Sequence, residues 1–289
     1  MITMDYCKPR TVDEALSSFG DDSVYIAGGT DLGVLLAEML ISPVGMIDLC
    51  AIDDMKGISR SDEGLTIGAC TLISDIAAAD DIPDCLSLGA AAIGSPQIRN
   101  MATIGGNICN ASPCGDTLTP LMVLDAEFEL KGAGGRRALA AGDFFRGPKK
   151  TALEPGEILT AVRIPAASLE GSITGFRMTG KRNGQVISQV NMAVWAVIID
   201  GKIENIRISA GSVAPVPLRL IRCEKMLQGK TAAEIMKDAF MKNLAAAAEV
   251  EITPISDVRA GEDYRRSVSG ALLVDIVTDL VSEGVKDED

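Results

Sequence analysis

The sequence predicts an α+β fold, and three observations support this class. Residues 11–50 alternate between short helical segments and short buried strands. Residues 174–213 contain three segments typical of antiparallel strands. Residues 231–250 and 264–280 place apolar side chains at helical spacing. With 289 residues, of which 47% are hydrophobic, the chain is long enough to bury cores in two or three small domains.

The N-terminal segment has clear helix and turn signals. In "TVDEALSSFG", Thr11 and Glu14 form a capping-box pattern and Gly20 marks the helix end. The next segment, "SVYIAGG", is typical of a buried strand that runs into a Gly-Gly turn. A helix over "TDLGVLLAEML" should follow, with Thr30 or Asp31 as its N-cap.

The middle segment continues with mixed elements. We expect strands over "GMIDLC", "GLTIGAC" and "GEILTAVRIP", and helices over "TLISDIAAA" and "DCLSLGAAAIG". In "TLTPLMVLDAEFELKG" a short apolar helix should give way to a strand whose alternate residues are Ala126, Phe128 and Leu130. Between these elements, "ATIGGNICNASPCGD" from Ala102 to Asp116 has neither helical nor strand periodicity, and we expect a loop.

The C-terminal segment follows a linker, "ASLEGS". Strands are expected over "TGFRMTGKR", "QVNMAVWAVIID" and "KIENIRISAGSV", with Asp200-Gly201 as the hairpin turn. A second capping box, Thr231 and Glu234, opens a helix over residues 231–250. The last helix should bury a stripe that repeats every four residues, formed by Tyr264, Val268, Leu272, Ile276 and Leu280.

Composition excludes several function classes. The formal net charge of −13 argues against binding to nucleic acid or to anionic membranes. The longest apolar runs fall far short of the about 20 residues that span a bilayer, so no membrane span is expected. The N-terminus lacks a basic segment followed by an apolar one, so a cytoplasmic chain is the simplest interpretation.

The absence of histidine limits the chemistry further. It removes the usual zinc ligand, the imidazole general base and the Ser-His or Cys-His nucleophile pairs. The seven cysteines are scattered without a CxxC motif, so free thiols are expected rather than a disulfide framework or a chain-held cluster. A reactive group would therefore arrive as a cofactor.

Two glycine pairs are candidates for holding such a cofactor. In "IAGGTDL" and "TIGGN" adjacent glycines permit positive φ and leave backbone N–H groups uncovered by a Cβ, which suits a diphosphate. Thr103 and Asn107 flank the second pair with side chains that can bond phosphate oxygens or a flavin edge. Neither segment matches GxGxxG or GxxxxGK[ST], and a Gly-Gly turn alone is more often only a tight turn.

The segments "IAGGTDL" and "TIGGN" occur in this order, and "NASPCGD" follows the second. In this arrangement the sequence resembles the FAD-binding (medium) subunits of the molybdenum hydroxylases, the family of xanthine dehydrogenase, aldehyde oxidase and carbon monoxide dehydrogenase. The resemblance extends through "GSPQIRNMATIGGNICNASPCGDTLTPLMVLDAEFEL", "LEPGEILTAVRIP", "GSVAPVPLR" and "RAGEDYRRSVSGALL", and so spans nearly the whole chain. It implies the p-cresol methylhydroxylase/vanillyl-alcohol oxidase type of FAD-binding fold, with two α+β subdomains at residues 1–56 and 57–166 and a C-terminal α+β domain at residues 172–289.

The resemblance also implies cofactor-binding residues. The first loop would lie along the FAD diphosphate, through Ala27, Gly28, Gly29, Thr30 and Asp31. The second segment would complete the cradle, through Thr103, Gly105, Gly106 and Asn107. The Asp116 carboxylate would hold polar groups of the cofactor, and the backbone of Leu159 would pack near the flavin. Arg177 matches a position beside the flavin that is lysine in xanthine dehydrogenases. Gly94 and Ser95 match the loop on the adenine side.

The implied function is electron transfer. FAD would pass electrons from the [2Fe–2S] clusters of an iron–sulfur (small) subunit to an acceptor such as NAD⁺, while a molybdopterin (large) subunit hydroxylates the substrate. Without histidine or an inserted cysteine-rich loop, non-covalent FAD and no cluster in this chain are expected, although cysteine or tyrosine linkage stays open. Two alternatives are a self-sufficient flavin reductase or oxidase of the same fold and a redox-inactive nucleotide-binding scaffold. The substrate stays open among purines, aldehydes, nicotinate and aromatic thioesters.

Overall fold

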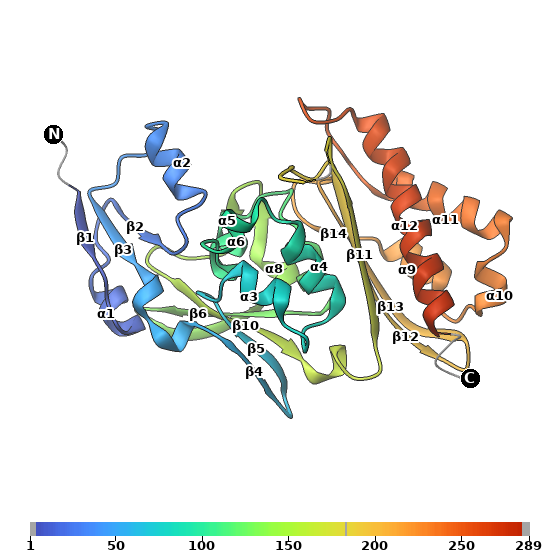
Figure 1. Cartoon of the computed structure of the whole chain (residues 1–289), viewed down its shortest axis with the longest axis horizontal. Coiled ribbons are helices and arrows are strands. Elements are labelled where there is room, and N and C mark those ends of the chain that lie inside the picture. The colour runs from blue at the N-terminus through green and yellow to red at the C-terminus, as the bar shows by residue number, and fades with distance from the viewer. Residues whose placement is uncertain (1–3, 183, 285–289) are drawn as a thin grey trace.

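The computed structural model describes residues 4–182 and 184–284. Within them, the strands form three larger sheets and one two-stranded pair. The sheets follow one another along the long axis of the molecule, from the N-terminal sheet at one end to the C-terminal sheet, whose helices form the other end (Figure 1).

The first sheet is parallel, with the order β1-β3-β2. Its strands are β1 (Asp5–Cys7), β2 (Ser23–Ile26) and β3 (Gly45–Asp48), and the connecting helices are α1 (Val12–Ser17) and α2 (Leu32–Ala37). The Thr11 side chain caps α1 by accepting from the Glu14 amide, while the Glu14 carboxylate accepts from the Arg10 amide, so only half of the expected capping box forms.

The second sheet is antiparallel and has the order β4-β5-β10-β6-β7. Two 3₁₀ turns precede it and one follows it: η1 (Leu49–Ala51), η2 (Asp53–Met55) and η3 (Ala166–Ser168). The strands are β4 (Ile58–Ser61), β5 (Gly64–Gly68), β6 (Glu127–Gly132), β7 (Gly135–Ala140) and β10 (Ile158–Pro165). The helices α3 (Ile73–Ala78), α4 (Asp84–Ala92), α5 (Pro96–Arg99), α6 (Ile104–Asn110) and α7 (Leu118–Val123) follow β5. A short helix and a strand pair come after β7: α8 (Ala141–Phe144), β8 (Phe145–Gly147) and β9 (Lys150–Thr151).

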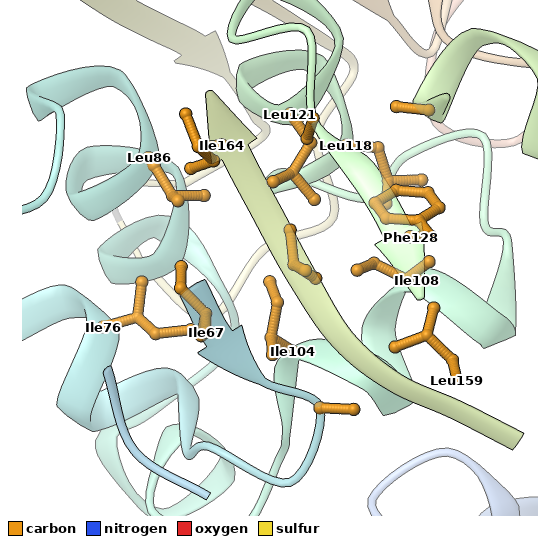
Figure 2. Close-up of a cluster of buried hydrophobic side chains, with 14 of the residues drawn as sticks. Ile67, Ile76, Leu86, Ile104, Ile108, Leu118, Leu121, Phe128, Leu159 and Ile164 are labelled. Carbon is orange, nitrogen blue, oxygen red and sulfur yellow. The ribbon is translucent and has the colours of Figure 1, made fainter. Parts of the chain in front are cut away.

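The helices that follow β5 bury one face of the second sheet. Figure 2 shows Ile67 of β5 next to Ile76 of α3, and Ile164 of β10 next to Leu86 of α4, with Ile104 of α6 in the same cluster. The alternation expected in β6 is confirmed, because Ala126, Phe128 and Leu130 are all buried.

The third sheet is antiparallel, with the order β11-β12-β13-β14. The strands are β11 (Ile173–Thr179), β12 (Val190–Ile199), β13 (Lys202–Gly211) and β14 (Leu218–Arg219), and the helices are α9 (Ile221–Leu227), α10 (Ala232–Ile235), α11 (Asp238–Glu251) and α12 (Glu262–Gly284). The hairpin at Asp200-Gly201 is confirmed, with positive φ at both residues. The Thr231 capping box is complete, but the helix expected over residues 231–250 is interrupted between α10 and α11.

The two faces of β12 differ in chemistry. Val190, Met192 and Val194 pack into a second apolar core with the C-terminal helices, which cover that face in Figure 1. The opposite face meets α4 and α7 of the preceding sheet and carries Asn191 and Trp195.

The buried face of α12 departs from the expected stripe in its first half. Ile276 and Leu280 are buried as expected, but Tyr264 is 45% exposed and the buried position beside it is Arg265. A spacing of four residues advances by about 40° per step on a helix of 3.6 residues per turn, so a strict repeat of four drifts off one face.

Candidate functional site

The first glycine segment forms a turn between β2 and α2. Gly29 adopts φ +68°, as expected for the turn, and residues Ala27 to Thr30 are half-buried. The amides of Gly28, Gly29, Thr30 and Asp31 donate to no acceptor within the described part of the chain. A row of four unpartnered N–H groups ahead of a helix suits an anion.

Gly28 brings this turn against the second glycine segment. A Cβ at Gly28 would lie 2.0 Å from the carbonyl oxygen of Met101 and 2.8 Å from the Cα of Ala102. The two segments therefore touch through bare backbone, although they are more than 70 residues apart in the sequence.

The second segment is a helix, and the expected loop is wrong here. Helix α6 starts within "TIGGN", with Thr103 as an N-cap whose hydroxyl accepts from the Gly106 amide at 3.1 Å. The Gly105 amide donates to Ala69, and neither glycine has positive φ. Glycine is required at position 105 because a Cβ would lie 2.7 Å from the Ala69 carbonyl oxygen. Gly105 and Gly106 thus allow close packing but offer no unpaired amide.

A pocket of about 890 Å³ opens beside these segments, at the upper end of the range for small-molecule and cofactor sites. One wall comes from α5, α6 and the loops beside them, within residues 93–116, and the other from loops of the C-terminal segment and the start of α12. Of the residues expected in the site, it brings together Asp31, Gly94, Ser95, Asn107 and Asp116.

Two of these lining residues have groups left over for a ligand. The Oδ1 of Asn107 accepts from Thr117 Oγ1 at 2.6 Å, and the side-chain nitrogen Nδ2 of Asn107 donates to no described residue. Ser95 Oγ accepts from the Ile98 amide and caps α5, and the Ser95 hydroxyl donates to no described residue.

Asp116 is the most buried carboxyl group of the pocket wall, with 5% of its surface exposed. Its Oδ1 accepts from Ser188 Oγ at 2.5 Å and from Asn191 Nδ2 at 2.9 Å. Burial raises the pKa of the Asp116 carboxyl to about 6, and the hydrogen bonds from Ser188 and Asn191 oppose that rise.

Sequence reasoning missed a cation beside the first loop. Lys149, between β8 and β9, places its Nζ 3.4 Å from both carboxylate oxygens of Asp31 and 2.5 Å from Oδ1 of Asn110. Lys149 has φ +58°, and its amide donates to Ala111, which has φ +44°. These two strained residues aim Lys149 at a partner 118 positions away, and no local pattern signals such a pairing.

The other nine expected residues do not line the pocket: Ala27, Gly28, Gly29, Thr30, Thr103, Gly105, Gly106, Leu159 and Arg177. The Leu159 side chain packs in the apolar core near Ile108, as Figure 2 shows. Arg177 bonds to Asp275 at 3.2 Å and to Asp279, both on α12. Its guanidinium is therefore held against the C-terminal helix, and its place beside the flavin stays a prediction.

The C-terminal wall contains charged residues to which the sequence analysis gave no role. Arg182, Asp257, Arg259 and Arg265 all line the pocket. The carboxylate of Asp257 accepts from the Arg265 guanidinium at 2.8 Å and from the amides of Arg259 and Ala260. In the sequence, "RAGEDYRR" contributes only to the family resemblance. Hydrophobic periodicity predicts buried apolar residues, so it does not predict that an arginine in this segment is buried.

The ionisation of Asp257 gives a pH prediction. Burial acts to raise the pKa of Asp257, but the amides of Arg259 and Ala260 and the charge of Arg265 outweigh it and lower the pKa to about 2. A carboxyl whose folded pKa lies below its unfolded value stabilises the fold above the unfolded pKa, and loses that contribution as the pH falls through the folded one. We expect the stability difference between the wild type and Asp257→Asn to shrink by about 1 kcal/mol, after allowance for solvent screening, between about pH 5 and about pH 2.5.

Urea unfolding at several pH values measures this difference. The control is Asp62→Asn, an exposed position whose side chain makes no bond to a described residue. A difference between wild type and Asp257→Asn that stays constant over this pH range would contradict the prediction.

The described residues, 4–182 and 184–284, include no helix long and apolar enough to span a membrane. They also include no cluster of three or more cysteine, aspartate or glutamate side chains suited to hold a metal ion.

Comparison with known proteins identifies relatives over the full length of this arrangement. Residues 2–167 match the family model of the FAD binding domain in molybdopterin dehydrogenase, and residues 176–280 match that of the CO dehydrogenase flavoprotein C-terminal domain. The carbon monoxide dehydrogenase medium chain of Afipia carboxidovorans is 34% identical over 94% of each chain. The glyceraldehyde dehydrogenase medium chain of Sulfolobus acidocaldarius is 32% identical over 91% of this chain and 93% of that one.

Solved structures agree with these relatives. A chain of the reconstituted CO dehydrogenase from Oligotropha carboxidovorans superposes with a TM-score of 0.90, at 30% identity over 97% of this chain and 98% of that one. A chain of quinoline 2-oxidoreductase from Pseudomonas putida 86 gives a TM-score of 0.90, at 25% identity over 98% of each. The sequence and the fold thus agree over both domains, and the chain belongs to the family of FAD-binding subunits of the molybdenum hydroxylases.

Proposed function

We propose that this chain binds one FAD non-covalently in the described pocket and serves as the electron-transfer subunit of a molybdenum hydroxylase complex. Its electrons would come from the [2Fe–2S] clusters of a small iron–sulfur subunit and go to an acceptor such as NAD⁺. A large molybdopterin subunit would carry out the hydroxylation. The family membership supports the cofactor and the reaction class.

The single observation that carries the cofactor proposal is the row of unpartnered amides from Gly28 to Asp31. These donors lie where the family's diphosphate-binding signature occurs, and they have no acceptor among the described residues. Lys149 adds a positive charge that offsets Asp31 beside them. The residues present therefore fit a dinucleotide with a negatively charged diphosphate.

The other residues would bind and orient the cofactor. Asn107 offers its amide NH₂ group, and Asp116 offers a carboxylate oxygen that accepts from no described residue. Gly94 and Ser95 would line the adenine side of the pocket. When bound, FAD supplies the ability to take up and release electrons one or two at a time, which side chains alone do not provide.

The rim of the pocket supports docking of the iron–sulfur subunit close to the flavin. Ile187 and Ile255 line the pocket and are 52% and 71% exposed, and Val258, three residues after Ile255, is 89% exposed. A stable protein interface has an apolar centre that loses its water, and these exposed apolar side chains would contribute to such a centre. We assign this rim to the small subunit.

Non-covalent attachment gives a direct prediction. The chain has no histidine for a covalent link, and burial raises the pKa of the thiol of Cys109, next to the pocket wall, to about 12, so this thiol is a poor nucleophile. Acid precipitation of the flavin-loaded protein should release essentially all FAD into the supernatant, measured by its absorbance. Flavin colour that stays with the precipitated polypeptide would contradict the proposal.

The complex is tested by affinity purification of this chain from its native host, with metal analysis. We expect iron and molybdenum to co-purify, and N-heterocycle, purine or aldehyde hydroxylation to require the partner chains. Hydroxylation by the lone, metal-free chain would overturn the subunit assignment.

A further inference from the structure

We propose that Ser188 and Asn191 are positioning residues for the flavin site, because they hold the carboxylate of Asp116 in its ligand-accepting orientation from the opposite domain. The inference rests on the proposed function, in which Asp116 faces FAD. It adds that β12 and the connection before it complete the site through residues that do not themselves line the pocket.

Both donors bond to the same carboxylate oxygen. Ser188 Oγ and Asn191 Nδ2 donate to Oδ1 of Asp116 at 2.5 and 2.9 Å. The other oxygen, Oδ2, accepts from no described residue, and Asp116 is part of the pocket wall. The arrangement therefore leaves one carboxylate oxygen to accept from a hydroxyl or ring N–H of a bound cofactor.

The two donors are themselves held in place. Asn191 Oδ1 accepts from Thr119 Oγ1 at 3.0 Å, and the Ser188 carbonyl accepts from Ser212 Oγ at 3.0 Å. Ser188 and Asn191 are both fully buried. A Cβ at Gly211, opposite Asn191 in the sheet, would lie 2.3 Å from Asn191 Oδ1, so the glycine makes room for this amide.

Orientation and ionisation are linked at this site. Hydrogen bonds to a carboxylate favour its charged form, and burial without them would favour the neutral acid. Loss of either donor should raise the pKa of Asp116, and a protonated Asp116 would no longer accept through both oxygens.

The other ionisable groups on the pocket wall do not contact the Asp116 carboxylate through hydrogen bonds. Cys114 precedes Asp116 on the same segment, Arg182 comes from the β11–β12 connection, and Asp257, Arg259 and Arg265 come from α12 and the loop before it. Asp31 and Lys149 pair with each other. None of them bonds to the Asp116 carboxylate, so the two donors are the groups to test.

The experiment compares Ser188→Ala and Asn191→Asp with the wild type. The pKa of Asp116 is measured by carbon NMR in the flavin-free chain, and the dissociation constant of FAD is measured between about pH 5 and about pH 8. We expect the pKa to rise by about one unit in Ser188→Ala and by more in Asn191→Asp, where two carboxyl groups share the site. FAD affinity of Ser188→Ala should fall about fivefold near pH 6 and recover toward the wild-type value at higher pH.

The matched control is Ser209→Ala on the neighbouring strand. Its hydroxyl is buried on the same side of the sheet but has no hydrogen-bond partner, so its removal should change neither quantity. An unchanged pKa of Asp116, or a loss of affinity that is the same at every pH, would overturn the inference. If the wild type itself binds no FAD, the proposed function fails, while the NMR titration still decides whether the two donors set the state of Asp116.

Discussion

Gly28→Ala is expected to lower the affinity for FAD by at least about 100-fold, equivalent to about 2.7 kcal/mol. The added Cβ would lie 2.0 Å from the Met101 carbonyl oxygen, so the turn must move away from the start of α6. The displaced turn would no longer present its four amides as one row. Crowding of backbone against backbone should also lower the free energy of unfolding by about 1–3 kcal/mol.

Flavin titration and urea unfolding of the same preparations measure the two effects. Gly33→Ala is the matched control, because a Cβ there meets nothing within 4 Å and the residue lies in α2. That variant should keep its flavin affinity and gain up to about 1 kcal/mol from helix propensity. Wild-type affinity in a folded Gly28→Ala protein would remove the first glycine turn from the site.

Arg265→Ala is expected to lower the free energy of unfolding by about 3–5 kcal/mol, the range for breaking a buried ionic network. Only 2% of Arg265 is exposed, and its guanidinium donates to the carbonyls of Gln189 and Ser212 and to the carboxylate of Asp257. These three segments form the C-terminal wall of the pocket. Without Arg265, two buried carbonyl groups lose their donor and Asp257 loses its counter-charge.

Thermal and urea unfolding measure the loss, and flavin affinity should fall with it. Arg222→Ala is the control, since Arg222 is exposed and its side chain bonds to no described residue, and its effect should stay within about 0.5 kcal/mol. Arg265→Lys keeps a charge but not the planar fork, so it should recover only part of the loss. A change below about 1 kcal/mol in Arg265→Ala would show that these carbonyls find other donors.

Local signals in the sequence predicted much of the fold. The Thr231 capping box, the Asp200-Gly201 hairpin and the alternation in β6 all depend on neighbours within a few residues, and the structure has them. Helix α6 was missed because two adjacent glycines have low helix propensity. The Thr103 cap and the close packing of Gly105 on Ala69 overrule that preference.

The candidate site was predictable only in part, because local signals do not show contacts between distant parts of the chain. The glycine turn and Asp116 carry a recognisable motif, whereas their partners come from distant parts of the chain. Lys149 reaches Asp31, and Asn191 reaches Asp116, through pairings that the sheet register and two strained backbone positions determine. Arg265 stands on a helix face where periodicity predicts apolar residues.

The polar face of β12 has a consequence for biosynthesis. Asn191 of β12 and Arg207 of β13 are buried against Asp116, Thr119 and Asp125 of the preceding half, so their hydrogen-bonding capacity is met only when that half is already folded. Burying a polar group without a partner is energetically unfavourable. Burial of this face of the sheet before the preceding half has folded would therefore be unstable. Because synthesis proceeds from the N-terminus, the N-terminal half can fold first and supply these partners. The C-terminal sheet can then pack against the folded N-terminal half as it is synthesised.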